Sequence, residues 1–170
     1  MQPLRRISDR LVVLGLGSNL GDRAANLKAA AQAIEILGNV RLVARSSVYE
    51  TPPAGGPAQA DYLNAAVLVE TELPFPVLMD AALAIERNLG RIRPDRVRWG
   101  PRTLDVDLLW CNLECCDDEA TLVPHPRLTE RPFALVPLLE LCPNASDPRR
   151  GIPYSELPAA RAEVRRVGAL

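Results

Sequence analysis

The chain has 170 residues, of which 48% are hydrophobic and 24% charged, and its formal net charge is −1. This composition predicts one folded domain over 1–170 and excludes a disordered chain. The near-zero charge argues against a nucleic-acid partner, and the apolar run Leu11–Leu16 is too short to span a membrane. We therefore expect a cytoplasmic protein that binds neither nucleic acid nor a membrane.

Cysteine and histidine usage argues against a zinc site. The four cysteines include no Cys-x-x-Cys spacing, and His125 is the only histidine. The cysteines are more simply interpreted as reduced thiols.

The first elements are a strand and a helix. We expect residues 1–10 to be a flexible extension and Leu11–Leu16 to be a buried strand. The glycine-rich segment that follows lacks the Lys-Ser/Thr ending of a P-loop, so it is interpreted as a strand-to-helix turn. Asp22 is the expected N-cap of a helix that runs to Leu37 and ends at Gly38.

A strand, a proline-rich loop and a second strand are expected next. Alternating residues predict a half-buried strand over Val40–Tyr49. The loop Thr51–Pro57 holds three prolines, so its backbone is either rigid and available to a flat ligand or a plain surface crossing. In the strand Tyr62–Glu70, Tyr62 and Asn64 share a face, where they either bind a heterocycle or form an ordinary strand surface.

The second half of the chain begins with a helix that opens at Pro74 or Pro76 and ends at Gly90. A short helix is expected over Leu135–Leu141, begun or broken at Pro137, and the tail after Pro143 is expected to add a short strand or helix at an edge. The element order matches a ferredoxin-like (split βαβ) α+β fold, an antiparallel sheet whose helices leave the other face open for a site.

The strand Thr103–Trp110 carries the residues with the clearest chemistry. Asp105 and Asp107 project from one face, because side chains two positions apart on a strand lie on the same side. Paired carboxylates favour Mg²⁺, and nearby guanidinium groups suit a polyphosphate. The alternative is a polar outer strand face. Five arginines lie just upstream, at positions 91, 93, 96, 98 and 102.

The stretch Trp99–Leu109 resembles the signature of the 6-hydroxymethyl-7,8-dihydropterin pyrophosphokinase family of folate biosynthesis. The resemblance implies that ATP gives its β,γ-pyrophosphate to the hydroxymethyl group of a dihydropterin and that AMP leaves. It covers about Leu11 to Pro143 and includes Gly15–Asp22, Tyr49–Pro53, Asp61–Asn64, Pro124–Pro126 and Arg131–Phe133.

The resemblance implies a set of site residues. Two Mg²⁺ ions would be held by Asp105 and Asp107, and Arg91 and Arg102 are the candidate catalytic clamps. The implied pterin pocket comprises Thr51, Pro53, Ala54, Tyr62, Asn64 and Phe133, and the implied nucleotide side comprises Glu86, Arg98, Trp99, Arg102, His125 and Arg131. Two positions, Leu83 and Pro126, depart from residues common in some relatives.

The expected partners are thus ATP and the pterin, bound by a monomer. The segment Arg91–Arg98 is expected to be a lid, since it holds little apolar area and many like charges. An RNA-binding module is a weaker interpretation, because only 4% of the residues are aromatic. A nucleotide sensor without catalysis is a further alternative, which a turnover assay would separate.

Overall fold

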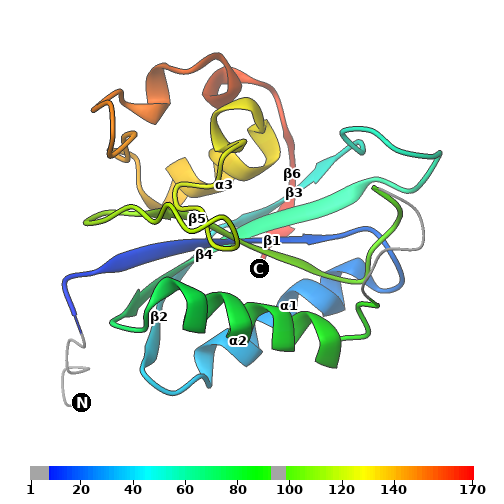
Figure 1. Ribbon diagram of the computed structural model, residues 1–170. Helices are drawn as coiled ribbons and strands as arrows, with labels where there is room; N and C mark the ends of the chain where they lie inside the picture. The colour runs from blue at the N-terminus through cyan, green and yellow to red at the C-terminus, as the bar shows by residue number, and fades with distance from the viewer. Residues whose placement is uncertain (1–7, 93–98) are drawn as a thin grey trace.

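The computed structural model describes residues 8–92 and 99–170. Its centre is one antiparallel sheet whose strands differ in length (Figure 1). The strands lie in the order β5-β1-β4-β3-β6, and β2 also pairs with β4. This arrangement of strands and helices agrees with the expected ferredoxin-like α+β fold. The strands are β1 (Leu11–Ser18), β2 (Val40–Arg45), β3 (Ser47–Thr51), β4 (Tyr62–Thr71), β5 (Asp105–Cys111) and β6 (Arg165–Ala169), and the α-helices are α1 (Arg23–Glu35), α2 (Phe75–Asn88) and α3 (Pro132–Leu141).

The helix ends show how local sequence chemistry sets the boundaries. The Asp22 carboxylate accepts a hydrogen bond from the Ala25 N–H at 3.0 Å, as expected for an N-cap. Helix α1 ends at Glu35, two residues before the predicted end, and Asn39 with φ 62° takes the left-handed conformation that we had expected of Gly38. Gly90 with φ 85° follows α2, as predicted.

The predicted strand Val40–Tyr49 is two strands, because Ser46 interrupts it. The Ser46 hydroxyl accepts a hydrogen bond from the Ala66 N–H at 2.8 Å, in a place where a strand carbonyl would otherwise pair. The Ser46 N–H donates to the Ala66 carbonyl at 2.9 Å, so both halves remain attached to β4. Strand β3 then leads directly into the proline-rich loop.

Both faces of the sheet are covered, which corrects the expectation of an open face. Helices α1 and α2 pack below the sheet in Figure 1, against residues such as Val12 and Leu14, which are 0% and 1% exposed. Helix α3 packs on the opposite face, where Leu135 and Leu138 contact a second core that includes Trp110. Since α3 covers only part of this face, the remaining part can hold a cavity.

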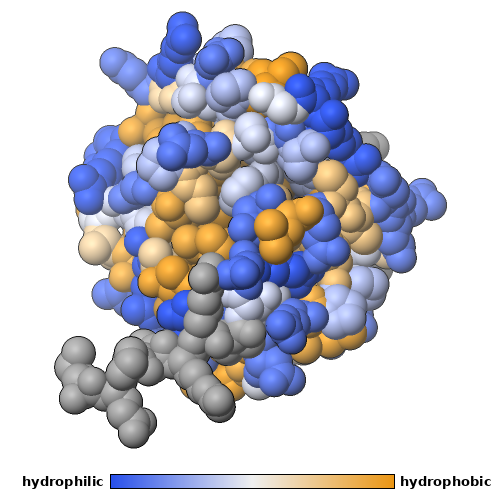
Figure 2. Space-filling view, turned by 90° about the vertical axis from the view of Figure 1, so that its left-hand side faces the viewer, coloured by the Kyte–Doolittle hydropathy of each residue, from blue (hydrophilic) through white to orange (hydrophobic). Residues whose placement is uncertain are grey.

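The two ends of the chain attach to the sheet. Arg10 was expected in a flexible extension, but it is 8% exposed and donates to the Leu73 carbonyl at 2.8 Å. Strand β6 in the C-terminal tail pairs with β3, so the tail adds an edge strand as expected. Figure 2 shows the end of the molecule that faces left in Figure 1, where apolar side chains gather near the middle and hydrophilic ones surround them. Among residues 8–92 and 99–170, no helix is long and apolar enough to cross a membrane.

Candidate active site

A cavity opens on the α3 side of the sheet, between β1, β4, β5, the loop after β3 and the start of α3. It brings together most of the residues that the sequence singled out, although they come from five parts of the chain. The predicted residues that line it are Thr51, Pro53, Ala54, Tyr62, Asn64, Trp99, Arg102, Asp105, Asp107, Arg131 and Phe133. We refer to Arg102, Asp105, Asp107 and Arg131 as the charged part, and to Thr51, Pro53, Tyr62, Asn64 and Phe133 as the aromatic part.

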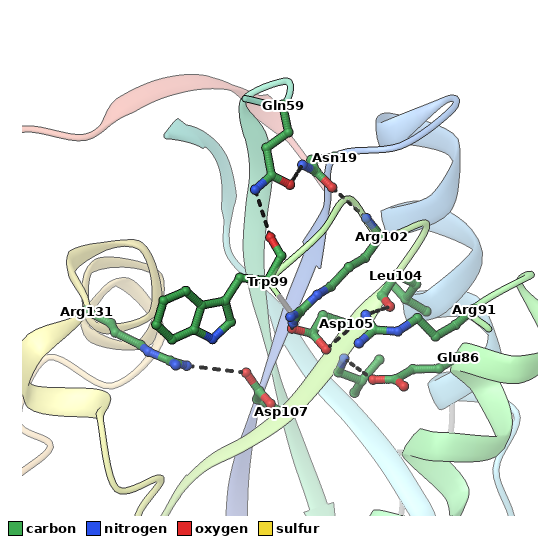
Figure 3. A network of polar contacts seen from close by, with 11 residues as sticks. Asn19, Gln59, Glu86, Arg91, Trp99, Arg102, Leu104, Asp105, Asp107 and Arg131 are labelled. Atoms are coloured by element: carbon green, nitrogen blue, oxygen red, sulfur yellow. Dashed lines mark hydrogen bonds and ion pairs between the residues drawn. The ribbon is translucent and has the colours of Figure 1, made fainter. Parts of the chain in front are cut away.

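Asp105 is held by two arginines (Figure 3). Its Oδ2 atom accepts a hydrogen bond from Arg102 Nη1 at 2.7 Å, and its Oδ1 atom lies 3.3 Å from Arg91 Nη1. The Asp105 side chain remains 22% exposed. The carboxylate is therefore fixed in direction while one side of it faces the cavity.

Asp107 lies on the same strand face but has a weaker partner. Its Oδ2 atom is 3.9 Å from Arg131 Nη1, and its side chain is 37% exposed. Burial and, to a smaller extent, the negative charge of Asp105 raise the pKa of Asp107, which Arg131 lowers, and the net pKa is about 7. The negative charge of Asp105 therefore opposes ionisation of Asp107, and a bound cation would relieve this repulsion.

The oxygen ligands of the cavity suit a hard divalent cation that takes most of its ligands from water or a substrate rather than from the protein. Two carboxylates face the cavity, and no group of three or more His, Cys, Asp or Glu side chains gathers within the described part of the chain. Zinc in structural sites takes four protein ligands, whereas Mg²⁺ usually keeps waters or substrate phosphates beside one or two carboxylates. The residues present therefore fit Mg²⁺ that arrives with a phosphate ligand.

Glu86 and Arg91 lie beneath β5 rather than in the cavity. Glu86 on α2 is fully buried, and its Oε1 accepts a hydrogen bond from the Val106 N–H at 2.9 Å. The Arg91 side chain is 3% exposed and donates to the Leu104 carbonyl at 3.0 Å. Both side chains therefore hold the strand that carries the aspartates. This placement does not support direct contact of either one with a nucleotide.

The expected lid, Arg91–Arg98, was predicted to begin at Arg91, but the Arg91 side chain is buried. Residues 93–98, including the predicted nucleotide contact Arg98, lie outside the described residues. Arg91 is anchored to the start of β5, so it does not belong to a segment that opens.

His125 lies beside the charged part and is neutral at pH 7. Burial and, to a smaller extent, the positive charge of Arg131 together lower its pKa to about 4. Its Nδ1 accepts a hydrogen bond from the Arg127 N–H at 3.1 Å, so the neutral ring carries its proton on Nε2. His125 does not line the cavity, and its backbone N–H donates to the Leu109 carbonyl at 2.9 Å.

The aromatic part is shaped by hydrogen bonds within the protein. Asn64 is 5% exposed, and its Nδ2 donates to Thr51 Oγ1 at 2.8 Å, which fixes the orientation of the amide. The Asn64 Oδ1 atom therefore faces Gly17, where an added Cβ would lie 3.4 Å away. Phe133 lines the same cavity, with the Arg131 guanidinium 5.6 Å from its ring centroid.

Sequence reasoning missed the floor of the cavity. Gly15 and Gly17 belong to β1, not to the turn, and both line the cavity. A Cβ on Gly15 would lie 3.0 Å from Leu109 Cδ1, and one on Gly17 would lie 3.9 Å from Asp105 Cβ. Their spacing of two residues is the period of a strand face, and that signal could have placed them there. Arg127 also lines the cavity and was not predicted to do so.

The ferredoxin-like sheet and a cavity with adjoining charged and aromatic parts fit a protein that binds small polar molecules. Comparison with family models then gives the family: residues 13–143 match 7,8-dihydro-6-hydroxymethylpterin-pyrophosphokinase, and the chain belongs to this family. The chain is 46% identical over 131 residues to the 2-amino-4-hydroxy-6-hydroxymethyldihydropteridine pyrophosphokinase of Methylorubrum extorquens, covering 77% of this chain and 82% of that one. It is 44% identical over 135 residues to the enzyme of that name from Bacillus subtilis, covering 79% of each.

Solved structures agree on the fold. An HPPK-DHPS protein in complex with substrates superposes with a TM-score of 0.63 at 12% identity, covering 89% of this chain and 42% of that chain. The Plasmodium falciparum HPPK-DHPS protein gives a TM-score of 0.60 at 14% identity, covering 85% and 42%. The chain thus spans less than half the length of these structures, and their likeness concerns the fold alone.

Proposed function

We propose that this protein transfers the β,γ-pyrophosphate of ATP to the hydroxymethyl oxygen of 6-hydroxymethyl-7,8-dihydropterin in folate biosynthesis. A bond forms between the hydroxymethyl oxygen and the β-phosphorus, and the bond from that phosphorus to the α,β-bridging oxygen breaks. AMP leaves with the bridging oxygen, and the hydroxyl proton passes to solvent. Membership of the pyrophosphokinase family supports the substrates and the reaction.

The observation that carries the proposal is the adjacency of the two parts of the cavity. Gly17 separates them, since its side-chain position is close to Asn64 and Tyr62 on one side and to Asp105 on the other. A heterocycle against the aromatic part would direct a substituent toward the carboxylates of β5. This is the placement that transfer between a bound pterin and a bound polyphosphate requires.

We propose that Asp105 and Asp107 hold two Mg²⁺ ions together with the phosphates of ATP. Bound Mg²⁺ would neutralise phosphate charge and orient the transferring group. The protein's own contribution is the fixed direction of the Asp105 carboxylate, which Arg102 and Arg91 maintain through contacts at 2.7 and 3.3 Å.

The arginines divide into two roles in this proposal. Arg102 and Arg131 line the cavity, so they can reach phosphate oxygens with charge-assisted hydrogen bonds. Arg91 and Glu86 act from beneath the strand as positioning residues. Tyr62 and Phe133 would stack on the two faces of the pterin, while Asn64 and the backbone near Thr51–Ala54 would contact its edge.

The test is mass spectrometry of the products after incubation with ATP, Mg²⁺ and 6-hydroxymethyl-7,8-dihydropterin. We expect AMP and a diphosphorylated pterin in equal amounts, and loss of both when EDTA removes the metal. ADP as the stoichiometric product would contradict pyrophosphate transfer. Binding of Mg-ATP without turnover would instead indicate a nucleotide sensor.

A further inference from the structure

Asn19 joins three segments that are far apart in the sequence (Figure 3). It directly follows β1 and is 3% exposed. Its Nδ2 donates to Gln59 Oε1 at 2.9 Å and to the Ala60 carbonyl at 3.1 Å, while its Oδ1 accepts from the Arg102 N–H at 2.7 Å. Both amide hydrogens and the carbonyl oxygen of one side chain are therefore engaged.

Gln59 extends this connection to Trp99. Its Nε2 donates to the Trp99 carbonyl at 2.9 Å and to the Gly55 carbonyl at 3.2 Å. The backbones at Gly56 and Trp99 lie so close together that a Cβ on Gly56 would be only 2.6 Å from the Trp99 carbonyl oxygen. The proline-rich loop is thereby fixed against the segment that leads into β5.

These hydrogen bonds connect the two parts of the cavity without entering it. The loop carries Pro53 of the aromatic part, and Arg102 bonds to Asp105 at 2.7 Å in the charged part. Neither Asn19 nor Gln59 lines the cavity. The backbone N–H of Asn19 also donates to the Arg102 carbonyl at 3.0 Å, so Asn19 binds both the backbone N–H and the backbone carbonyl of Arg102.

We propose that Asn19, acting through Gln59, is a positioning residue that sets the distance between the acceptor hydroxyl and the phosphorus it attacks. The inference rests on the proposed pyrophosphate transfer. A group in this role contributes little to the affinity for either ligand alone, because each part of the cavity keeps its own contacts. It contributes to the rate of transfer, since a small misplacement of two reacting atoms costs far more in rate than in binding.

The test compares Asn19→Asp with a matched control, Asn26→Asp. The first change keeps the shape and the acceptor for the Arg102 N–H, but it replaces both donors to Gln59 and Ala60. Asn26 lies on α1 and donates to the Leu20 and Thr103 carbonyls at 3.0 Å each and to Ser18 Oγ at 3.1 Å. It thus ties the end of β1 and the turn after it to the segment that leads into β5, without contacting the loop. The control thus loses comparable bonds in the same region.

We expect Asn19→Asp to lower kcat by about 10- to 100-fold. The dissociation constants of 6-hydroxymethyl-7,8-dihydropterin and of Mg-α,β-methylene-ATP, each measured alone, should change less than about threefold. Asn26→Asp should lower the melting temperature but keep kcat within about threefold of the wild type. Gln59→Ala, at a half-buried position, should reproduce the loss of kcat, and Asn19→Asp with Gln59→Ala should be no slower than either single variant.

Three outcomes would overturn the inference. These are an unchanged kcat in both Asn19→Asp and Gln59→Ala, equal losses of kcat in Asn19→Asp and Asn26→Asp, or weaker binding of one ligand that accounts for the whole effect. If Asn19→Asp fails to fold, Gln59→Ala alone decides. Release of AMP by the wild type, measured in parallel, separates failure of this inference from failure of the proposed reaction.

Discussion

The charged and aromatic parts of the cavity adjoin each other, yet they are organised in different ways. In the aromatic part, the Thr51–Asn64 hydrogen bond and the prolines after β3 set the shape before any ligand arrives. In the charged part, two carboxylates share one strand face, and Asp107 is only loosely paired with Arg131 at 3.9 Å. The first part is therefore preorganised, whereas in the second the two carboxylates repel each other until a cation binds.

Removing a carboxylate should give the largest effect, because it abolishes the function of the charged part. Asp105→Ala or Asp107→Ala is expected to lower kcat/KM by about 10³-fold or more, equivalent to about 4 kcal/mol, through lost charge stabilisation of phosphate. The fold should persist, since repulsion between the two carboxylates is relieved. The measurement is AMP release, with Glu119→Ala at an exposed site as the control. Near-normal turnover in both variants would rule out the metal assignment.

Removing an aromatic ring should affect one ligand only. Phe133→Ala is expected to weaken pterin binding by about 1–3 kcal/mol, the scale of base stacking on aromatic side chains, and to leave the affinity for Mg-α,β-methylene-ATP unchanged. Phe133→Leu keeps apolar volume but loses the ring face, so it should restore stability without restoring affinity. Isothermal titration provides both constants. If both ligands bind equally weakly, the ring belongs to the core rather than to a binding platform.

A smaller change tests whether the aromatic part is preorganised. Thr51→Val removes the hydroxyl that orients Asn64 and should weaken pterin binding by about 1 kcal/mol, or roughly fivefold. The control is Thr71→Val, which removes a buried hydroxyl that donates to the Asn39 carbonyl at 2.7 Å, away from the cavity. The control should lower stability and leave pterin affinity unchanged. An unchanged affinity in Thr51→Val would mean that the amide is oriented by other contacts.

The smallest expected effect is a pH dependence of stability that belongs to the charged part. The pKa of Asp107 is raised from 3.8 to about 7 in the folded protein, so the unfolded chain ionises first as the pH rises. Asp107 should therefore leave stability unaffected below pH 4 and reduce it increasingly from pH 4 to 7. Because the side chain is 37% exposed, solvent screening limits the cost to about 1 kcal/mol.

This dependence is measured as the difference between Asp107→Asn and the wild type in chemical denaturation without Mg²⁺. The variant should be about 1 kcal/mol more stable at pH 8 and nearly equal at pH 4. Added Mg²⁺ should stabilise the wild type more than the variant and close the gap. A difference that is the same at both pH values would show that Asp107 is not held out of its usual ionisation range.

The fold and the cavity residues were predicted where the signal is local or periodic. The period of two placed Asp105 with Asp107, and Tyr62 with Asn64, on their shared faces, and all four line the cavity. The same pattern could not show that Arg91 is buried, because its position depends on the Leu104 carbonyl, 13 residues later. Charge alone suggested a phosphate contact there.

Contacts between distant segments could not be predicted from the sequence, because local and periodic patterns do not show which segments meet. Asn19 and Gln59 are separated by 40 residues, and neither belongs to a periodic pattern that would pair them. The cover that α3 provides was also missed, since Pro137 suggested a broken helix, while α3 runs from Pro132 to Leu141 with that proline inside it. Tertiary packing stabilises the helix despite the proline.

The Glu86–Val106 hydrogen bond also has a consequence for the edge of the sheet. Strand β5 lies at the edge of the sheet, and edge strands offer unpaired N–H groups to a neighbouring chain. Glu86 occupies the Val106 N–H, and Asp105 and Asp107 add two charges along the strand. The strand that carries these aspartates is thus a poor template for intermolecular β-pairing, because one of its N–H groups is already bonded and two charges lie along it.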